Sequence, residues 1–318
     1  MKHILGFAPM DGFTDAACRC ITQEIRDKYG EKDRYDFRLW TEFMTADGFV
    51  RNPEGVLHHM ETTANQTKLI AQIFGGNAET LQQTMTTLQA EYSDRFIGLE
   101  LNMGCPANNI MRSGGGAELL RDKCNSLDII KSLRAIIKMP FSIKTRTGVD
   151  IPDKEAQMKF LAEASEFVDM ITIHGRTAKQ GYGPGLDREF IYEAKRQIEA
   201  LRGNTVKVLG NGGILSYEEI DGYIKNLDGV MIGQAAIGNP WIFTPHIPSH
   251  EEKRDTILRH FSLIPDTERA RIEFRKHLFQ YIKGIPGSKE RKVHMSQIKD
   301  RETMESEIRK FFESTNIQ

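Results

Sequence analysis

Short apolar runs alternate with amphipathic helical patterns along roughly the first 240 residues. Several runs are almost continuously apolar, which is typical of parallel strands buried on both faces. Strands are predicted at Ile4–Pro9, Phe37–Phe43, Lys68–Phe74, Ile97–Asn102, Phe141–Arg146, Met170–His174, Val206–Gly210 and Gly229–Gly233. Helices are predicted between them at Asp15–Tyr29, Ala78–Tyr92, Ser126–Ile137, Lys154–Phe167, Glu189–Leu201 and Tyr217–Lys225.

Eight strands that alternate with helices predict an α/β fold, the (β/α)8 or TIM barrel. A doubly wound sheet is the alternative, but no Gly-x-Gly-x-x-Gly motif follows the first strand. After Pro245 the strand patterns stop, and the rest is charged and helix-prone, with helices predicted at Glu251–Leu263, Thr267–Ile282 and, as one or two, within Ser288–Glu313. We therefore expect a TIM-barrel domain over residues 1–244 and a small all-helical domain over residues 245–318.

The composition is that of an ordinary globular protein and does not indicate a particular binding partner. The chain has 39% hydrophobic and 27% charged residues, which is ordinary for a globular protein. It contains no apolar run of membrane-spanning length, and its first apolar stretch is too short for a signal peptide, so we expect a cytoplasmic protein. The four cysteines suggest no disulfide scaffold, and Cys18-x-Cys20 lacks zinc-ligand spacing, so no metal site is expected.

Charge is distributed unevenly along the chain. The formal net charge is −1, yet residues 245–318 contain 15 Lys or Arg against 12 Asp or Glu. The basic residues Lys289, Arg291 and Lys292 follow the turn formed by residues 284–287. Such a cluster suits an anionic partner, although a solvated helical face would produce the same pattern.

The stretch from Leu101 to Ala117, LNMGCPANNIMRSGGGA, carries the strongest sign of chemistry. An apolar run ends at Asn102, and Cys105 follows in a Gly-Cys-Pro turn at the carboxyl end of a predicted strand. Barrel enzymes place their reactive groups at that end. A small buried hydrophobe is the usual role of a free cysteine. Here the flanking turn and the glycine-rich loop favour a functional thiol.

Glycine loops follow the last two strands of the predicted barrel. They contain Asn211-Gly212-Gly213 and Gly233-Gln234. Exposed backbone N–H groups in such loops suit an anionic phosphate, although turn glycines that merely permit positive φ are the alternative. Because both loops show the pattern, we favour a phosphate site.

Three further strand ends carry polar side chains toward the same edge. Lys144 lies in an apolar strand and needs an electron-rich partner, such as the N1/O2 edge of a flavin. Gln72 could meet the pyrimidine edge of that ring with one donor and one acceptor. His174, beside Arg176 in the sequence HGRT, is expected to face phosphate or substrate.

Taken together, these segments resemble the flavin-dependent tRNA-dihydrouridine synthase family, in its bacterial B-type or a close relative. The resemblance covers about residues 4–300 and includes APMDGFTD, TEF, QIFGG, LNMGCPANNIMRSGGGAELL, KTRTG, IHGRTAKQGYGPG, GNGGI and MIGQAAIGNPWIF. The later segment KHLFQYIKGIPGSKERK resembles the helical RNA-binding domain of that family.

The resemblance implies an FMN cofactor that NADPH (or NADH) reduces, and a tRNA partner. We expect a monomer without a stable protein partner, although the sequence leaves the oligomeric state open. Reduced FMN would pass a hydride to C6 of a flipped uridine, and Cys105 would donate a proton to C5. The implied cofactor-binding residues are Pro9, Met10, Gln72, Lys144, His174, Asn211, Gly212, Gly213, Gly233 and Gln234. The implied substrate-binding residues are Asn102 and Arg176 near the uracil, with Lys289, Arg291 and Lys292 on the RNA.

Two positions depart from the family pattern. Members of the family usually carry Arg where Gln234 stands, so the phosphate of FMN loses a charged partner here. Lysines are common in the family where Asn108 and Asn109 stand. Their absence implies that the catalytic loop contacts RNA more weakly, or that the enzyme acts on a different site in its substrate.

Three other functions stay open at this point. The first is a flavin barrel dehydrogenase that acts on a free pyrimidine, which would have no use for a basic helical domain. The second is a non-catalytic RNA-binding protein, against which the intact Cys105, Lys144 and His174 argue. The third is the same chemistry on ribosomal RNA. The modified uridine and the preferred reductant are likewise open.

Overall fold

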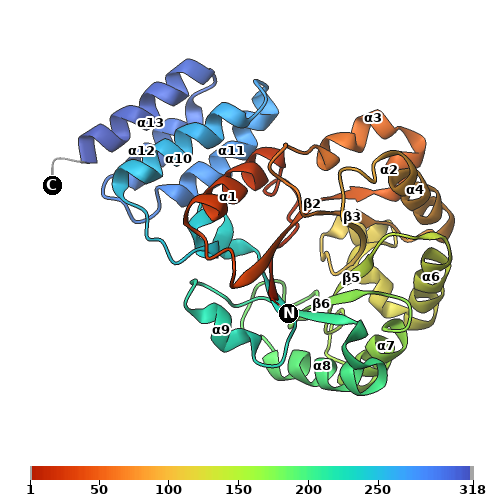
Figure 1. Cartoon of the computed structure of the whole chain (residues 1–318). Coiled ribbons are helices and arrows are strands. Elements are labelled where there is room, and N and C mark those ends of the chain that lie inside the picture. Colours follow the sequence, from red (N-terminus) through yellow and green to blue (C-terminus); the bar gives the residue numbers. More distant parts are fainter. Residues whose placement is uncertain (1, 316–318) are drawn as a thin grey trace.

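Eight parallel strands close into one barrel in the computed structural model, which describes residues 2–315 (Figure 1). Each strand pairs with the next in sequence, and β8 pairs with β1, so the predicted TIM barrel is confirmed. The strands are β1 (His3–Phe7), β2 (Tyr35–Thr45), β3 (Leu69–Phe74), β4 (Gly98–Met103), β5 (Phe141–Arg146), β6 (Met170–His174), β7 (Lys207–Asn211) and β8 (Gly229–Ile232).

The six helices predicted between the strands all form on the outside of the barrel. They are α1 (Ala16–Tyr29), α4 (Ala78–Glu91), α6 (Lys123–Ile136), α7 (Lys154–Ala164), α8 (Arg188–Arg202) and α9 (Glu219–Ile224). A side chain at the N-cap accepts a backbone N–H of the first turn in five of them, from Asp15, Asn77, Asp122, Asp153 and Asp187. Such caps satisfy N–H groups that have no partner within the helix and so define where each helix begins.

Several short helices were not predicted. The connection from β2 to β3 contains α2 (Ala46–Arg51), α3 (Pro53–Val56) and the 3₁₀ helix η1 (Leu57–Met60). The segment after β4 contains α5 (Asn108–Arg112) and η2 (Gly116–Arg121). The remaining 3₁₀ turns are η3 (Gly203–Thr205), η4 (Gln234–Ala236) and η5 (Pro240–Phe243). Elements of three to six residues are too short to show a helical period.

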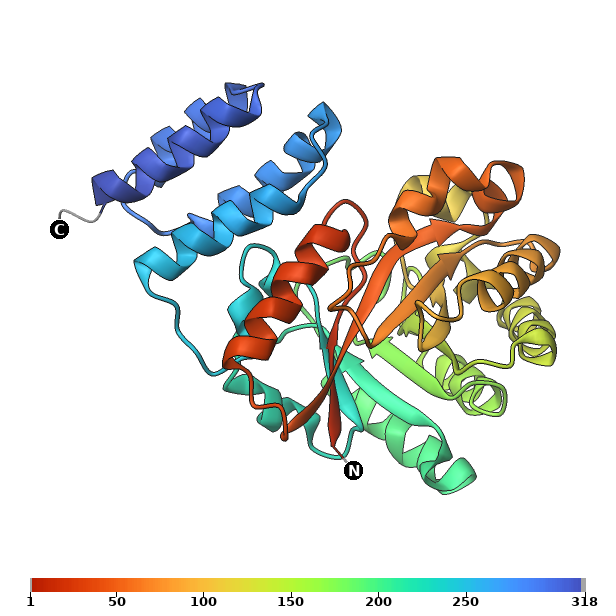
Figure 2. The same cartoon turned by 45° about the horizontal axis from the view of Figure 1, so that its top comes forward.

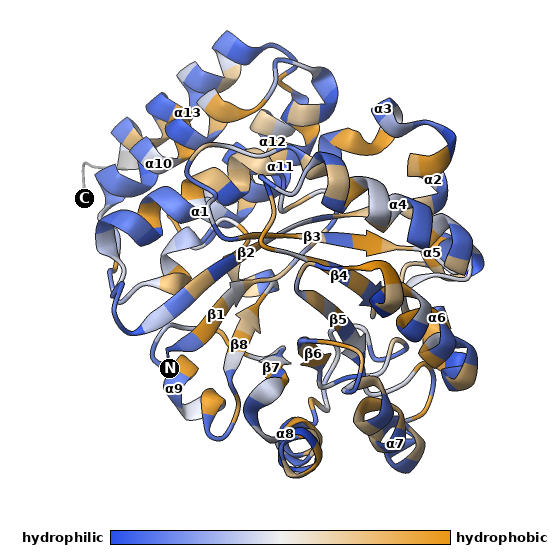
Figure 3. Ribbon diagram, turned by 45° about the vertical axis from the view of Figure 1, so that its right-hand side comes forward, coloured by the Kyte–Doolittle hydropathy of each residue, from blue (hydrophilic) through white to orange (hydrophobic). Residues whose placement is uncertain are grey.

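An apolar cluster fills part of the barrel interior. Trp40 is fully buried and forms a cluster with Ile4, Ala8, Ile70, Met170, Leu209 and Met231. Gly6 makes room for this indole, because a Cβ there would lie 2.8 Å from the Trp40 ring. A larger apolar layer lies between the strands and the surrounding helices (Figure 3). The apolar cluster around Trp40 therefore supports the polar residues at the rim from below.

Four helices follow the barrel, namely α10 (His250–Leu263), α11 (Glu268–Tyr281), α12 (Ser288–Gln297) and α13 (Arg301–Thr315). The stretch Ser288–Glu313 thus holds two helices. Of these C-terminal helices, α10 packs against α1 (Figures 1 and 2). The four helices share an apolar cluster with Ile21, Ile25 and Trp241. The predicted domain boundary at residues 244 and 245 stays a prediction. Among the helices of residues 2–315, none combines the length and apolar character that crossing a bilayer requires.

The C-terminal helices also reach the loop after β1. His277 donates from Nε2 to the carbonyl oxygen of Phe13 at 2.8 Å, and Lys276 donates from Nζ to the carbonyl oxygen of Gly12 at 3.3 Å. Since a carbonyl only accepts, the Nε2 of His277 must carry the proton. The helices therefore contact a loop that follows a barrel strand as well as the outer face of α1.

Two neighbouring residues of α11 test how much this packing stabilises the protein. Phe274 is 2% exposed in the shared apolar cluster, and Ile272 is 47% exposed. Phe274→Ala should lower the free energy of unfolding by about 3–5 kcal/mol, whereas Ile272→Ala should change it by less than about 0.5 kcal/mol. Urea unfolding followed by circular dichroism measures both, and equal losses would contradict the assigned packing.

Candidate active site

A cavity of about 750 Å³ opens among the carboxyl ends of the strands. Every barrel residue that the sequence analysis assigned to cofactor, substrate or catalysis lines this cavity: Pro9, Met10, Gln72, Asn102, Cys105, Lys144, His174, Arg176, Asn211, Gly212, Gly213, Gly233 and Gln234. The structure therefore brings together residues that are far apart in sequence. Their individual roles stay predictions.

The Cys105 thiol follows β4 on a tightly held turn. The Asn102 side-chain oxygen accepts the backbone N–H groups of Gly104 at 3.0 Å and Cys105 at 2.9 Å. Behind the turn, Gly116 has φ of +60°, and a Cβ there would lie 2.7 Å from the Cys105 carbonyl oxygen. Burial raises the pKa of the Cys105 thiol above its ordinary value. The thiol is therefore protonated at neutral pH and can act as an acid.

Two buried amides and one buried carboxylate lie next to this turn. Asn102 donates from Nδ2 to the side-chain oxygen of Gln72 at 2.8 Å. Gln72 donates from Nε2 to Glu100 at 2.6 Å, and Ser142 donates to the other carboxylate oxygen at 3.0 Å. Sequence reasoning missed Glu100. The signal was a charged residue at an alternate position in an apolar strand, two residues before Asn102 and on the same face.

Two cations come from β5. No hydrogen bond or ion pair of the Lys144 ammonium is found among the described residues, and burial lowers its pKa. Arg146 donates to the carbonyl oxygens of Gly104 at 2.7 Å, Thr177 at 2.9 Å and Gly181 at 3.1 Å, and burial lowers its pKa to about 10. Arg146 thus joins the turn that carries Cys105 to the loop after β6, a role that the sequence did not reveal.

The glycine loops pack closely against the end of β6. Gly212 has φ of +102°, and a Cβ there would lie 2.8 Å from the His174 ring. Gly213 has φ of +77°, and its Cβ would lie 2.5 Å from Leu186. Only glycine fits this backbone. Arg176 donates to Nε2 of His174 at 3.2 Å, and burial with nearby Arg146, Lys144 and Arg176 lowers the pKa of His174 to about 2. The neutral imidazole thus lies beside the backbone of Gly212 and Gly213, which have no side chain to cover it. We call this stretch of backbone the glycine cradle.

Comparison with known proteins agrees with this geometry. The family model described as dihydrouridine synthase (Dus) matches residues 6–316. The chain belongs to this family. The resemblance seen in the sequence is therefore confirmed, and Cys105, Lys144 and the glycine loops belong to a dihydrouridine synthase family barrel.

Curated relatives of this dihydrouridine synthase family member cover most of its length. It is 28% identical to a probable tRNA-dihydrouridine synthase of Aquifex aeolicus over 304 residues, which are 91% of this chain and 89% of that protein. It is 25% identical to tRNA-dihydrouridine synthase B of Pseudomonas putida, over 98% of this chain and 92% of that protein. A histamine dehydrogenase structure from Rhizobium sp. 4-9 superposes with a TM-score of 0.52 at 11% identity, over 81% of this chain and 48% of that chain. That likeness concerns the fold alone.

The three basic residues predicted to bind RNA lie on α12 and do not line the cavity. Arg291 pairs with Glu307 of α13 at 2.9 Å, and His294 and Lys310 approach the same carboxylate at 3.4 Å and 2.9 Å. Part of the positive charge in this dihydrouridine synthase family member is therefore offset within the C-terminal helices. The RNA-binding role of these residues stays a prediction.

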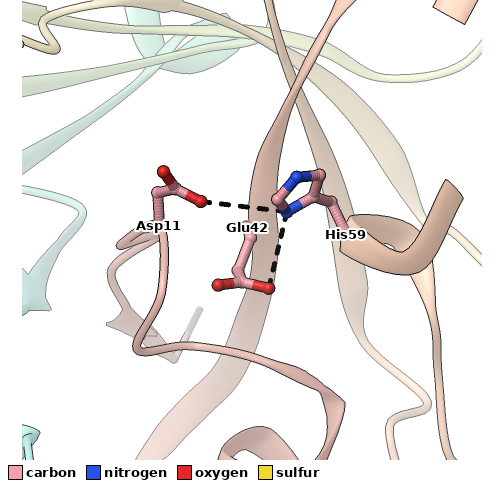
Figure 4. A group of neighbouring side chains, drawn as sticks. All are labelled: Asp11, Glu42 and His59. Carbon is pink, nitrogen blue, oxygen red and sulfur yellow. Dashed lines mark ion pairs between the residues drawn. The ribbon is translucent and has the colours of Figure 1, made fainter. Parts of the chain in front are cut away.

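Asp11, which lines the cavity, lies next to the side chains of Glu42 and His59 (Figure 4). The Nδ1 of His59 is 3.8 Å from Asp11 and 3.6 Å from Glu42, and Glu42 also accepts the backbone N–H of Gly12 at 2.6 Å. No metal site is expected from the sequence, yet one ligand atom from each of these three residues lies within 4.8 Å of the other two. We assign no ligand here, because the imidazole and the Gly12 N–H already face the carboxylates.

The raised pKa of Cys105 predicts how the thiol reacts with iodoacetamide. The thiolate is the reactive species, so alkylation of Cys105 should be slow at neutral pH and rise with a midpoint above the ordinary thiol value of 9.0. Peptide mass spectrometry across a pH series measures the rate at this position. Cys105→Ser is the blank, and a midpoint below pH 8 would show an activated nucleophile instead.

Proposed function

We propose that the protein is a tRNA-dihydrouridine synthase that uses FMN as cofactor and NADPH as reductant. It reduces the C5–C6 double bond of uridine in tRNA, and Cys105 donates the proton to C5. The observation that carries the proposal is a protonated thiol at the end of β4 that shares one cavity with the glycine cradle and Lys144. The printed names of the relatives add tRNA as the substrate class.

The residues present fit FMN in two respects. The cradle at Gly212 and Gly213 lets the backbone approach an anion where any side chain would collide with His174 or Leu186, and such loops suit a phosphate. Lys144 and Arg176 add positive charge to the same cavity. Pro9, Met10 and Gln72 would line the ring, and Lys144 would meet its electron-rich edge. When bound, the flavin supplies the hydride.

Side chains of the protein would position the Cys105 thiol and supply the proton. Asn102 holds the backbone of Cys105, so the thiol keeps a defined position at the cavity wall. Burial keeps this thiol protonated, as a general acid requires. Arg146 restrains the Cys105 turn through its bond to Gly104. A uridine in folded RNA must leave its stack to reach such a cavity, and the C-terminal helices beside the first loop offer a surface for the rest of the RNA.

The purified protein should be yellow, with about one noncovalent FMN per chain. Gln234→Arg should tighten FMN, because a charge-assisted hydrogen bond to phosphate is roughly twice as strong as a neutral one. Gly212→Ala should weaken FMN, because the new Cβ would lie 2.8 Å from His174. Fluorescence titration of the apoprotein measures all three.

The matched control for the glycine change is Gly222→Ala in α9, where a Cβ meets nothing within 4 Å. Bound FAD in place of FMN, or unchanged affinity in both Gln234→Arg and Gly212→Ala, would place the phosphate elsewhere.

Removal of the thiol should separate flavin chemistry from uridine reduction. Cys105→Ala should bind FMN and accept electrons from NADPH normally, but form dihydrouridine roughly 10²–10⁴-fold more slowly, as expected for loss of a general acid. Stopped-flow flavin absorbance and mass spectrometry of transcribed tRNA measure the two half-reactions. Cys124→Ala, at an exposed cysteine of α6, is the control. Reduction of free uracil as fast as of tRNA would favour a pyrimidine dehydrogenase.

Neutralising Lys289, Arg291 and Lys292 together should weaken tRNA binding and flatten its dependence on salt. Each lost phosphate contact removes roughly one unit from the log–log slope. Because Arg291 already pairs with Glu307, the slope should change by about two units rather than three. Filter binding at several salt concentrations measures this, with Lys131→Ala/Lys159→Ala on α6 and α7 as control. An unchanged slope would leave α12 a structural role alone.

A further inference from the structure

A continuous line of hydrogen bonds joins the buried carboxylate of Glu100 to the backbone of Cys105. It runs from Glu100 to Gln72 at 2.6 Å, from Gln72 to Asn102 at 2.8 Å, and from Asn102 to the N–H of Cys105 at 2.9 Å. Glu100 and Gln72 are fully buried, and Asn102 is 5% exposed. Gln72 and Asn102 also line the cavity, whereas Glu100 lies behind them.

The groups at the two ends of this line determine the direction in which each hydrogen bond is donated. Backbone N–H groups only donate, so the side-chain oxygen of Asn102 must face Gly104 and Cys105, and its NH₂ must face Gln72. Gln72 must then present its oxygen to Asn102 and its NH₂ to the next group. That group has to be an acceptor, and Glu100 is the acceptor found there.

The surroundings of Glu100 keep it an acceptor. Gln72 donates to one carboxylate oxygen and Ser142 to the other, and no acceptor contact of Glu100 is found in the described part of the chain. Burial raises the pKa of Glu100, while Gln72, the Lys144 ammonium, Ser142 and the Trp40 indole N–H lower it. A buried donor left facing another donor would lose its hydrogen bond, so the whole line depends on the residue at position 100.

We propose that Glu100 is a positioning residue for Cys105, which it holds in place by setting the orientation of the Gln72 and Asn102 amides. This inference rests on the proposed function for the part that Cys105 plays in catalysis. The hydrogen-bond line itself does not depend on that function, and it can be tested without any substrate.

The test of the line is a double-mutant cycle on stability. In Asn102→Asp, acceptors stand at both ends of Gln72, so one oxygen must face another whichever way that amide turns. Adding Glu100→Gln supplies a donor at the far end, and the line can run in the reverse sense. We expect Asn102→Asp to lower the melting temperature by roughly 5 °C or more, Glu100→Gln alone to change it little, and the double variant to regain more than half of the loss.

A matched double variant distinguishes the effect of a new N–H donor at position 100 from the effect of removing its negative charge. Glu100→Met/Asn102→Asp removes the same negative charge at the same position but supplies no N–H, so it should not regain the lost melting temperature. Equal recovery with Gln and Met would overturn the proposal in favour of charge balance near Lys144. Additive effects in the cycle would also overturn it.

The catalytic readout distinguishes positioning from general support of the fold. At saturating tRNA, Glu100→Met should slow dihydrouridine formation roughly tenfold or more, since small displacements of reacting groups are costly. The tRNA dissociation constant should stay unchanged, and Glu100→Gln should keep most of the rate. A normal rate in Glu100→Met would overturn the positioning role. If the unaltered protein forms no dihydrouridine in any RNA, the proposed function fails, while the stability cycle still decides the hydrogen-bond line.

Discussion

Closure of the parallel sheet is the constraint on which the rest of this structure depends. Because all eight strands run in the same direction around one barrel, their carboxyl ends meet at one rim. Residues as distant in sequence as Pro9 and Gln234 therefore line the same cavity. The alternation of side chains along each strand then decides what enters the barrel. On β4 it places Leu99 and Leu101 in the outer apolar layer and Glu100 and Asn102 inside.

Much of the fold and the membership of the candidate site could be predicted from the sequence. Strand positions follow from short apolar runs, and in a barrel the polar residues at their ends must converge, as Gln72, Lys144 and His174 do. Contacts between strands could not be predicted in the same way. The bonds from Arg146 to Thr177 and Gly181 depend on the path of the loop after β6. The pairing of Arg291 with Glu307 likewise depends on how α12 meets α13.

The electrostatics of the cavity favour an anionic ligand. Lys144, Arg146 and Arg176 come from neighbouring strand ends, and together with burial they hold His174 neutral. Glu100 lies fully buried beside them, where its carboxylate is satisfied by Gln72 and Ser142. Glu100 is the acidic neighbour of Lys144, and no hydrogen-bond partner of the Lys144 ammonium is found among residues 2–315.

Helix α1 belongs to two apolar cores at once. Cys18 packs in the layer around the barrel, while Ala17, Ile21 and Ile25 pack with the C-terminal helices. The segments before and after residue 245 therefore share apolar contacts through α1. In evolutionary terms, the C-terminal helices cannot be exchanged independently of α1, because they pack against its side chains. A recombination that imported another set of C-terminal helices would have to bring along the matching face of a helix encoded more than two hundred residues earlier.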